Sequence, residues 1–178
     1  MTFLDRNSKM KFDPLGKSPI PLPALLLSKF IMLCSWLFFI VRMKRPGLML
    51  YTSDFTDTLG VMLFVAGLIC LLVSLFQLGH AASVGLPRIK TELRTSGFYT
   101  WTRNPVYLGA FSMCAGSCLY AMHFLNFLLF AVTFAFHHRI VLKEEAFLAK
   151  TFGHAWEEYR ARVPRYFGWV RKQSNLSL

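Results

Sequence analysis

The sequence predicts an all-α membrane protein with about four transmembrane helices, a C-terminal helical hairpin and an amphipathic cytoplasmic tail. The 178-residue chain is 54% hydrophobic and only 16% charged, whereas about 25% of the residues of a soluble domain are charged. Four apolar stretches approach the roughly 20 residues that cross a bilayer. The polar connections between them are short. No soluble domain of ordinary size therefore fits between the stretches.

The first apolar stretch, Leu22–Val41, follows a polar and basic N-terminal arm, residues 1–21. It is longer than the hydrophobic region of a signal peptide, and a stop-transfer cluster follows it (Arg42, Lys44 and Arg45). We therefore expect a helix that stays in the membrane and that begins an integral membrane domain over residues 22–178. Lys29 interrupts this stretch, so it is expected near an interface, where its ammonium can reach water.

The second stretch is Leu59–Leu78, and the third and fourth, Val106–Met122 and Phe124–Val141, are nearly contiguous. As one straight helix the last two would be about 50 Å long at 1.5 Å per residue. The hydrocarbon core is only about 30 Å thick. The chain must therefore fold back, and we expect a tight helical hairpin with its turn at Met122–Asn126.

After the fourth stretch the sequence keeps a helical apolar stripe but adds charges on the other faces. The pattern predicts that the fourth helix continues out of the membrane and ends near Gly153. A second amphipathic helix, His154–Val163, is then expected to stop at Pro164. Four aromatic residues of this region are expected to anchor at the membrane interface: Trp156, Tyr159, Tyr166 and Trp169.

The net charge of +11 lies beside the apolar stretches, which favours anionic lipid headgroups over nucleic acid as its partner. The basic loop Gly79–Arg103 and the basic C-terminal segment place both termini and that loop in the cytoplasm. The loop after the first stretch has basic residues of its own, offset by Asp54 and Asp57, so the orientation signal is not unanimous.

Polar residues gather where the third and fourth stretches reach the same membrane face. Tyr99, Arg103, Asn104 and Tyr107 precede or begin the third stretch, and Glu144 and Glu145 follow the fourth. Adjacent carboxylates beside a membrane repel each other unless a cation or hydrogen-bond donor faces them. A cationic ligand or a ribose would supply that partner. The alternative is that both glutamates are ordinary solvated helix residues. No metal site is expected, because His137 and His138 point about 100° apart in a helix and no Cys or Asp lies at metal spacing.

Two segments together resemble a known family. "TSGFYTWTRNPVYLG", a hairpin, and "EEAFLAKTFGHAWEEYRARVPRY" follow one another in the C-terminal half. In this order and spacing they resemble the isoprenylcysteine carboxyl methyltransferase family and the wider group of small membrane methyltransferases, which includes phospholipid N-methyltransferases. The resemblance implies S-adenosylmethionine as cofactor, bound by about residues 88–170.

The resemblance also implies the site residues. Those expected around the cofactor are Leu93, Tyr99, Arg103, Asn104, Pro105, Tyr107, Glu144 and Glu145. Arg103 and Glu144 are the expected catalytic residues, with Arg103 pairing with the carboxylate of the cofactor and acting on it rather than on the fold. The family often has histidine where this chain has Asn104; an amide does not titrate near neutrality, so no general-base role is assigned there.

The implied activity is methyl transfer to a membrane-embedded amphiphile, such as the carboxylate of a prenylated cysteine or a related lipid group. The expected partners are thus the lipid bilayer and an amphiphilic, lipid-like or prenylated substrate, with no nucleic acid and no metal. Two alternatives stay open. One is a phospholipid amine N-methyltransferase, and the other is a non-catalytic membrane scaffold with no affinity for the cofactor.

Overall fold

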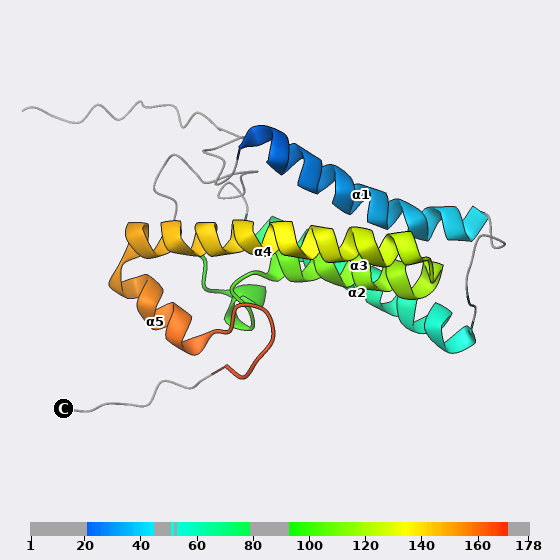
Figure 1. The fold of residues 1–178 in the computed structure, drawn as a ribbon. Coiled ribbons are helices and arrows are strands. Elements are labelled where there is room, and N and C mark those ends of the chain that lie inside the picture. Colours follow the sequence, from blue (N-terminus) through cyan, green and yellow to red (C-terminus); the bar gives the residue numbers. More distant parts are fainter. Residues whose placement is uncertain (1–20, 45–50, 52, 79–92, 171–178) are drawn as a thin grey trace, which may run out of the picture.

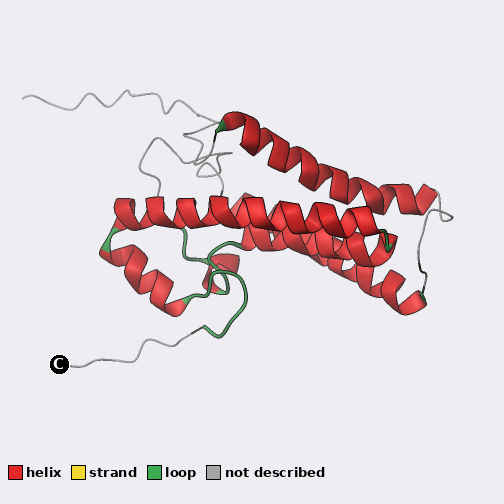
Figure 2. Cartoon of the chain, viewed as in Figure 1, coloured by secondary structure: helices red, strands yellow, loops and turns green. Residues whose placement is uncertain are grey.

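The structure, a computed structural model, describes residues 21–44, 51, 53–78 and 93–170. Throughout these residues the regular structure is helical (Figure 2). The elements are α1 (Leu22–Lys44), α2 (Asp54–Leu78), the 3-10 turn η3 (Gly97–Thr100), α3 (Pro105–Ala121), α4 (Phe124–Phe152) and α5 (His154–Arg162). The polar arm expected before the first helix and the loop before residue 93 lie outside the described residues.

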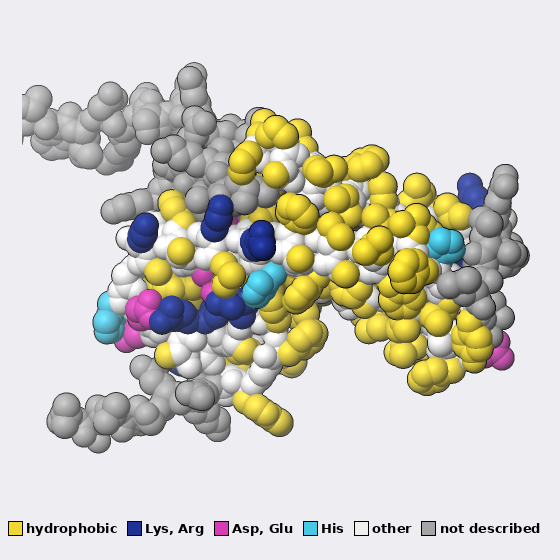
Figure 3. Space-filling view, in the orientation of Figure 1, with side chains coloured by type: hydrophobic (Ala, Val, Ile, Leu, Met, Phe, Trp, Pro, Cys, Tyr) yellow, Lys and Arg dark blue, Asp and Glu magenta, His cyan; other side chains and the backbone are white. Residues whose placement is uncertain are grey.

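The helices α1 to α4 run alternately in opposite directions along an elongated bundle (Figure 1). One end therefore holds the first residues of α1 and α3, the last residues of α2 and α4, and both η3 and α5; we call it the polar end. On the face shown in Figure 3, charged side chains gather at this end, and hydrophobic side chains cover most of the remaining length. The arrangement brings together the two segments on which the sequence places the candidate site.

Within the described residues, α1, α2 and α4 are long and apolar enough to cross a membrane, judged by length and composition. They expose large hydrophobic side chains such as Phe30, Met62 and Phe76, as expected of helices that face lipid. The third stretch forms a helix as predicted, but α3 has 17 residues. At 1.5 Å per residue it is about 26 Å long, and much of its surface is buried by its neighbours. An all-helical membrane fold is confirmed, whereas a fourth span stays a prediction.

The hairpin between α3 and α4 turns at the predicted position. Met122 adopts the left-handed conformation with φ 39°, and its N–H bonds to the carbonyl of Cys118, which ends α3. His123 then caps α4, because its side chain accepts a hydrogen bond from the N–H of Leu125. At the other end of α4, Gly153 takes φ 51°, a value that glycine adopts at little cost. The predicted end of α4 and start of α5 are thus confirmed.

Four glycines bring the backbones of α2 and α3 into contact. Gly60 and Gly67 lie seven residues apart on α2 and face Gly116 and Gly109 of the antiparallel α3. A Cβ atom added at Gly67 would lie 2.7 Å from the carbonyl oxygen of Gly109, and one at Gly116 would lie 2.6 Å from that of Gly60. Small residues allow such close packing in membranes. The α2–α3 pair is therefore the tightest contact that positions the start of α3.

Polar side chains tie α1 to the rest of the bundle. Ser35 donates a 2.7 Å hydrogen bond to Asn126 of α4, whose side-chain amide donates to Ser117 of α3 at 3.0 Å. The Ser117 hydroxyl donates in turn to the Ser35 carbonyl at 2.6 Å. Near the end opposite the polar end, Arg42 pairs with Asp57 of α2. These contacts fix α1 against α3 and α4 without a large hydrophobic driving force.

The expectation that Trp156 and Tyr159 anchor in the membrane interface is wrong. Both side chains are buried, with 1% and 3% of their surface exposed. They form a small core with Val163, against which Leu93 and Leu148 pack. The reason is that α5 folds back beside η3 (Figure 1) and turns its aromatic face inward. Trp169 by contrast is 95% exposed, as an interface residue would be.

Candidate functional site

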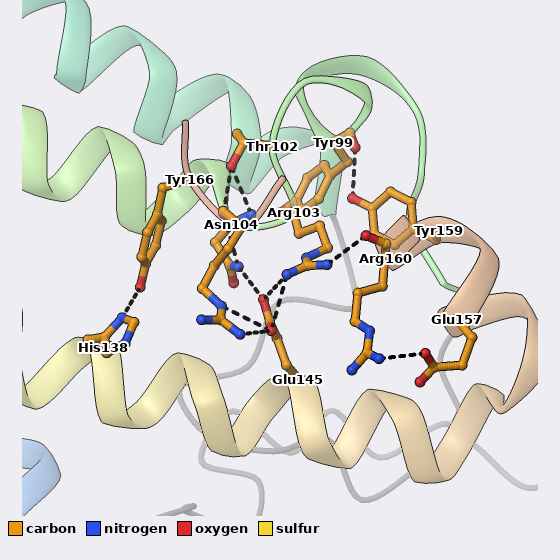
Figure 4. Close-up of polar contacts among 11 residues, drawn as sticks. Tyr99, Thr102, Arg103, Asn104, His138, Glu145, Glu157, Tyr159, Arg160 and Tyr166 are labelled. Atoms are coloured by element: carbon orange, nitrogen blue, oxygen red, sulfur yellow. Dashed lines mark hydrogen bonds and ion pairs between the residues drawn. The ribbon is translucent and has the colours of Figure 1, made fainter. Parts of the chain in front are cut away.

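Glu145 of α4 is the centre of a buried polar junction at the polar end, with 6% of its surface exposed. Arg165 donates twice to its Oε2, through Nε at 3.1 Å and Nη2 at 2.8 Å, so the two side chains form a charge-assisted pair. The side-chain amide of Asn104 donates at 3.0 Å, and Nη2 of Arg103 lies 3.3 Å from the same carboxylate. Figure 4 shows Arg103 and Asn104 converging on Glu145. One carboxylate thus joins three segments that are distant in the sequence.

Arg103 is held on several sides. Its Nη1 donates to the carbonyl of Arg160 at 3.0 Å, and its guanidinium lies 5.6 Å from the ring centroid of Trp156. Its Nε is buried with no hydrogen-bond partner among the described residues. These contacts give Arg103 a part in holding the fold, which the sequence-based expectation had excluded. Its predicted pairing with a carboxylate of the cofactor stays a prediction.

The segment after α5 lies across the residues that precede α3 and is hydrogen-bonded to them; we call this segment the strap. The N–H of Arg103 donates to the carbonyl of Pro164 at 2.9 Å, and the Thr102 hydroxyl donates to the carbonyl of Arg165 at 2.8 Å. The hydroxyl of Tyr159 donates to the carbonyl of Tyr99 at 2.7 Å. These bonds satisfy backbone groups of a loop that has no regular ladder. They fix the residues around the start of α3 in one conformation.

Glu144, the neighbour of Glu145, faces a different partner. The hydroxyl of Tyr107 donates to its Oε1 at 2.9 Å, and its other oxygen has no hydrogen bond within the described part of the chain. Lys29 of α1 lies on the ring of Tyr107, with its Nζ 5.6 Å from the ring centroid. Successive residues of a helix point about 100° apart. The two adjacent glutamates therefore lie in two different environments.

Aromatic and histidine side chains line the deeper part of the same region. His137 is fully buried; its ring lies 6.0 Å from that of Tyr107 and 6.4 Å from that of Phe111, centroid to centroid. His138 is hydrogen-bonded to the hydroxyl of Tyr166 at 3.2 Å (Figure 4). Tyr166 also packs edge-on against Phe111 at 5.8 Å. These rings pack against one another beside the Tyr107–Glu144 pair.

Burial changes the acidity of the groups outside the spans. It raises the pKa of Tyr99 to about 12, and the nearby carboxylate of Glu144 adds to that shift. Burial likewise raises the pKa of Tyr166 to about 12. Burial lowers the pKa of Arg103, and Glu145 opposes that shift. Both tyrosines therefore stay protonated at neutral pH and can donate a hydrogen bond to a ligand.

The structure brings most of the predicted site residues together. Arg103, Asn104 and Glu145 share the junction, while Tyr107 and Glu144 form a pair beside it. Pro105 begins α3, where a missing N–H is tolerated, and its carbonyl accepts from the Cys70 thiol. Tyr99 is near enough to Glu144 to interact electrostatically. Leu93 instead packs on the small core formed by α5.

Sequence reasoning missed residues that complete the junction. They are Thr102, Trp156, Arg160 and Arg165, as the contacts above show. Lys29, which the sequence also left out of the site, lies beside the junction on the ring of Tyr107. Arg165 lies in the "VPRY" piece, in which the sequence assigned a role only to Tyr166, as an interface anchor. Its role depends on the position of α5, which local sequence does not determine.

The arrangement provides a protected polar site at the edge of the apolar bundle. One carboxylate oxygen of Glu144 makes no hydrogen bond with the described residues. The hydroxyl of Tyr99 makes none either, because the bond at Tyr99 involves its backbone carbonyl. Such groups suit a ligand with an ammonium, a sulfonium or ribose hydroxyls. The hydroxyl of Tyr159 holds the backbone at Tyr99, and the hydroxyl of Tyr107 holds Glu144, before any ligand binds. This order lowers the entropy cost of binding.

Comparison with known proteins gives a family for this arrangement. Residues 55–155, more than half of the chain, match the family described as phospholipid methyltransferase. A segment of 73 residues is 37% identical to the Protein-S-isoprenylcysteine O-methyltransferase of Schizosaccharomyces pombe. That segment is 40% of this chain, and it spans only 31% of the length of the yeast protein. No solved structure matches the chain.

Proposed function

Because the chain belongs to the phospholipid methyltransferase family, we propose that it transfers a methyl group from S-adenosylmethionine to an amphiphile embedded in the bilayer. The observation that supports this best is the Glu144–Tyr107 pair beside the Glu145 junction. In this pair, one oxygen of Glu144 has no hydrogen bond from the described residues, and it lies between the charged end and the apolar helices. A water-soluble charged cofactor and a lipid-borne acceptor have to meet at such a boundary.

The residues at the polar end fit the chemistry of the cofactor. S-adenosylmethionine carries a sulfonium, an ammonium and two ribose hydroxyls, each of which is attracted by or donates to a carboxylate oxygen. The free oxygen of Glu144 is suited to one of them, and the protonated hydroxyl of Tyr99 can donate to the cofactor. The sulfonium itself makes methyl transfer favourable. The protein has mainly to align the two reactants and exclude water.

The two glutamates take different parts in this proposal. Glu144 contacts the cofactor, while Glu145 holds Arg103, Asn104 and Arg165 in place. Pro105 and Tyr107 help to form the cofactor site because they belong to the first turn of α3. Leu93 supports the site by packing against α5. For Arg103 we propose that its guanidinium pairs with the carboxylate of the cofactor and keeps its contact with Glu145.

The proposed acceptor is an amphiphile whose reacting group is a carboxylate, such as that of a prenylated cysteine. The name of the yeast relative supports it, since that protein is an isoprenylcysteine O-methyltransferase. The proposed setting is a cytoplasmic membrane face, with four spans and both termini on that face. The basic residues of the chain around the polar end support this orientation.

Equilibrium binding of S-adenosylmethionine to the full chain in detergent tests the proposal. We expect saturable binding, and we expect transfer of a labelled methyl group to a lipid-soluble product when membranes are supplied. A labelled methyl ester, released by mild base, would identify a carboxylate acceptor, whereas a base-stable label on a phospholipid would identify an amine. Absence of any cofactor binding by folded protein would return the chain to the scaffold alternative.

A further inference from the structure

Lys29 is a cation inside the first membrane helix, about two turns from the polar end. Its ammonium lies 5.6 Å from the ring centroid of Tyr107 on α3. Within the described part of the chain it makes no hydrogen bond and no ion pair as close as 4 Å, although the carboxylate of Glu144 attracts it from further away. Lys29 precedes residues 55–155, which match the family, so it is not explained by the family pattern.

An ammonium in this position has unused binding capacity. It carries three N–H donors, and the cation–π contact with Tyr107 uses none of them as a hydrogen bond. Ionised groups within membrane spans are costly and are retained where they have a partner or a function. The side chain is half-buried, so one side is accessible to a ligand. A ligand with negative oxygen atoms would satisfy these donors.

A second polar atom near Tyr107 also lacks a partner. The Nδ1 of His137 is 2.9 Å from the carbonyl of Thr133; because a carbonyl only accepts, that nitrogen carries the proton. The other nitrogen, Nε2, is then an acceptor, and it is buried with no partner among the described residues. Buried polar atoms are nearly always paired in native proteins. A carboxylate has no proton to donate to this nitrogen, so the unused donors of Lys29, and not His137, are the groups that a negatively charged ligand would satisfy.

We infer that Lys29 binds the anionic head group of the methyl acceptor, a carboxylate at the end of an amphiphile that enters between the membrane helices. This inference rests on the proposed function. In the reaction a carboxylate oxygen forms a bond to the methyl carbon, the carbon–sulfur bond of the sulfonium breaks, and its electron pair goes to sulfur. No proton moves. The product is a neutral ester, which no longer pairs with the ammonium and so dissociates more readily. A protonated amine would be repelled by Lys29.

The test uses the full chain in detergent and three probes. The first is S-farnesyl-N-acetylcysteine, the second is its uncharged carboxamide with the same lipid tail, and the third is phosphatidylethanolamine in mixed micelles. Equilibrium binding of the first two probes is measured without turnover, and methyl transfer to the first and third is measured with labelled S-adenosylmethionine. The variants are Lys29→Met and Lys29→Arg. Lys44→Met, at the far end of the same helix, is the matched control for loss of a positive charge.

The parent chain should bind the carboxylate probe about tenfold or more tightly than the carboxamide, as expected of a charge-assisted hydrogen bond in a protected site. Lys29→Met should abolish this preference and raise the KM for the carboxylate, with cofactor affinity nearly unchanged. Lys29→Arg should keep the preference in part, and Lys44→Met should keep it fully.

Three results would overturn the inference. They are an equal preference in Lys29→Met and the parent chain, a loss of cofactor binding in Lys29→Met, and methylation of phosphatidylethanolamine but not of the carboxylate by the parent chain. The proposed function fails separately, if the parent chain neither binds cofactor nor methylates any probe. The binding comparison of carboxylate with carboxamide still decides the role of Lys29 in that case.

Discussion

Two adjacent glutamates illustrate how much one residue position changes a role. Glu145 accepts hydrogen bonds from Arg165 and Asn104 and pairs with Arg103, so its charge is fully used by the protein. Glu144 accepts one hydrogen bond, from Tyr107, among the described residues. A helix turns about 100° per residue. The Glu145 side chain therefore points to the strap, and the Glu144 side chain points to the bundle. We therefore expect Glu144 to affect cofactor binding and Glu145 to affect stability, and one substitution at each position tests this.

The Glu144→Gln variant is predicted to bind S-adenosylmethionine about tenfold or more weakly, because a hydrogen bond to a charged group contributes roughly 1.5–3 kcal/mol. Its thermal stability should change little, since the amide can still accept the hydroxyl of Tyr107. Isothermal titration calorimetry on the purified protein measures the affinity. Glu157→Gln, on the exposed face of α5, is the control and should bind normally. Unchanged affinity in Glu144→Gln would mean that this side chain does not face the cofactor.

The Glu145→Gln variant is predicted to lose stability by about 3 kcal/mol, the lower end of the range for breaking a buried ion pair, because Arg165 is partly exposed. The reason is that Arg103 would be left buried without a counter-charge. Thermal unfolding in detergent measures the change, again beside Glu157→Gln. A melting temperature equal to that of the parent chain would show that the junction does not hold the strap.

Arg103→Lys separates the two roles of that arginine. Lysine keeps the charge but loses the planar fork that reaches Glu145 and the Arg160 carbonyl together. We expect a lower melting temperature and a cofactor affinity reduced about tenfold, as for a lost charge-assisted hydrogen bond. Calorimetry and thermal unfolding on the same preparation measure both. A reduced melting temperature with normal affinity would assign Arg103 to the fold alone.

At the scale of the helices, the α2–α3 contact sets where the site begins. Gly67 and Gly109 let the two backbones touch, and α3 starts at Pro105, one turn from Gly109. The position of Tyr107 therefore depends on a contact between two apolar helices. Packing at this distance leaves no space for a methyl group.

Gly67→Ala is accordingly predicted to destabilise the protein by roughly 1–3 kcal/mol, the usual cost of overpacking a tight contact. The added Cβ would lie 2.7 Å from the Gly109 carbonyl oxygen and 2.8 Å from the Met113 nitrogen, so the helices must move apart. Thermal unfolding measures the effect. Ala66→Val enlarges the exposed neighbour and should leave the melting temperature nearly unchanged. The prediction is wrong if both variants behave alike.

For the whole molecule, the alternating directions of α1 to α4 place all the elements of the candidate site at one end (Figure 1). Among the described residues, the opposite end holds the Arg42–Asp57 pair and the α3–α4 turn. Under the proposed function, a cofactor from the cytoplasm and an acceptor from the bilayer meet only if the polar end faces the cytoplasm. The orientation thus decides the route of entry.

Cysteine labelling in intact cells tests this orientation. Thr100 is exposed at the polar end and Tyr51 is exposed near the start of α2. We expect a membrane-impermeant maleimide added outside to label Tyr51→Cys but not Thr100→Cys, which should react only after the membrane is opened. The native cysteines lie in apolar helices, where an aqueous reagent reacts poorly, and the parent chain is the control for them. The reverse pattern of labelling would overturn the cytoplasmic site.

The sequence by itself determined the helices and the turns between them. Long apolar runs, the Met122–Asn126 break and Gly153 are local signals, because helix length and termination depend on neighbouring residues. The order of the motifs likewise identified the residues that meet at the polar end, including Glu144 and Tyr107.

Tertiary structure alone decided which partner each of those residues contacts. Trp156 and Tyr159 look like interface anchors in sequence, yet α5 folds back and buries them. Arg165 and Lys29 reach the site from segments 20 residues and more than 100 residues away from the glutamates. An ion pair or a cation–π contact depends on distance in space, and no local pattern encodes which cation faces which carboxylate. For that physical reason the helices could be predicted from the sequence, whereas the division of labour between Glu144 and Glu145 required the fold.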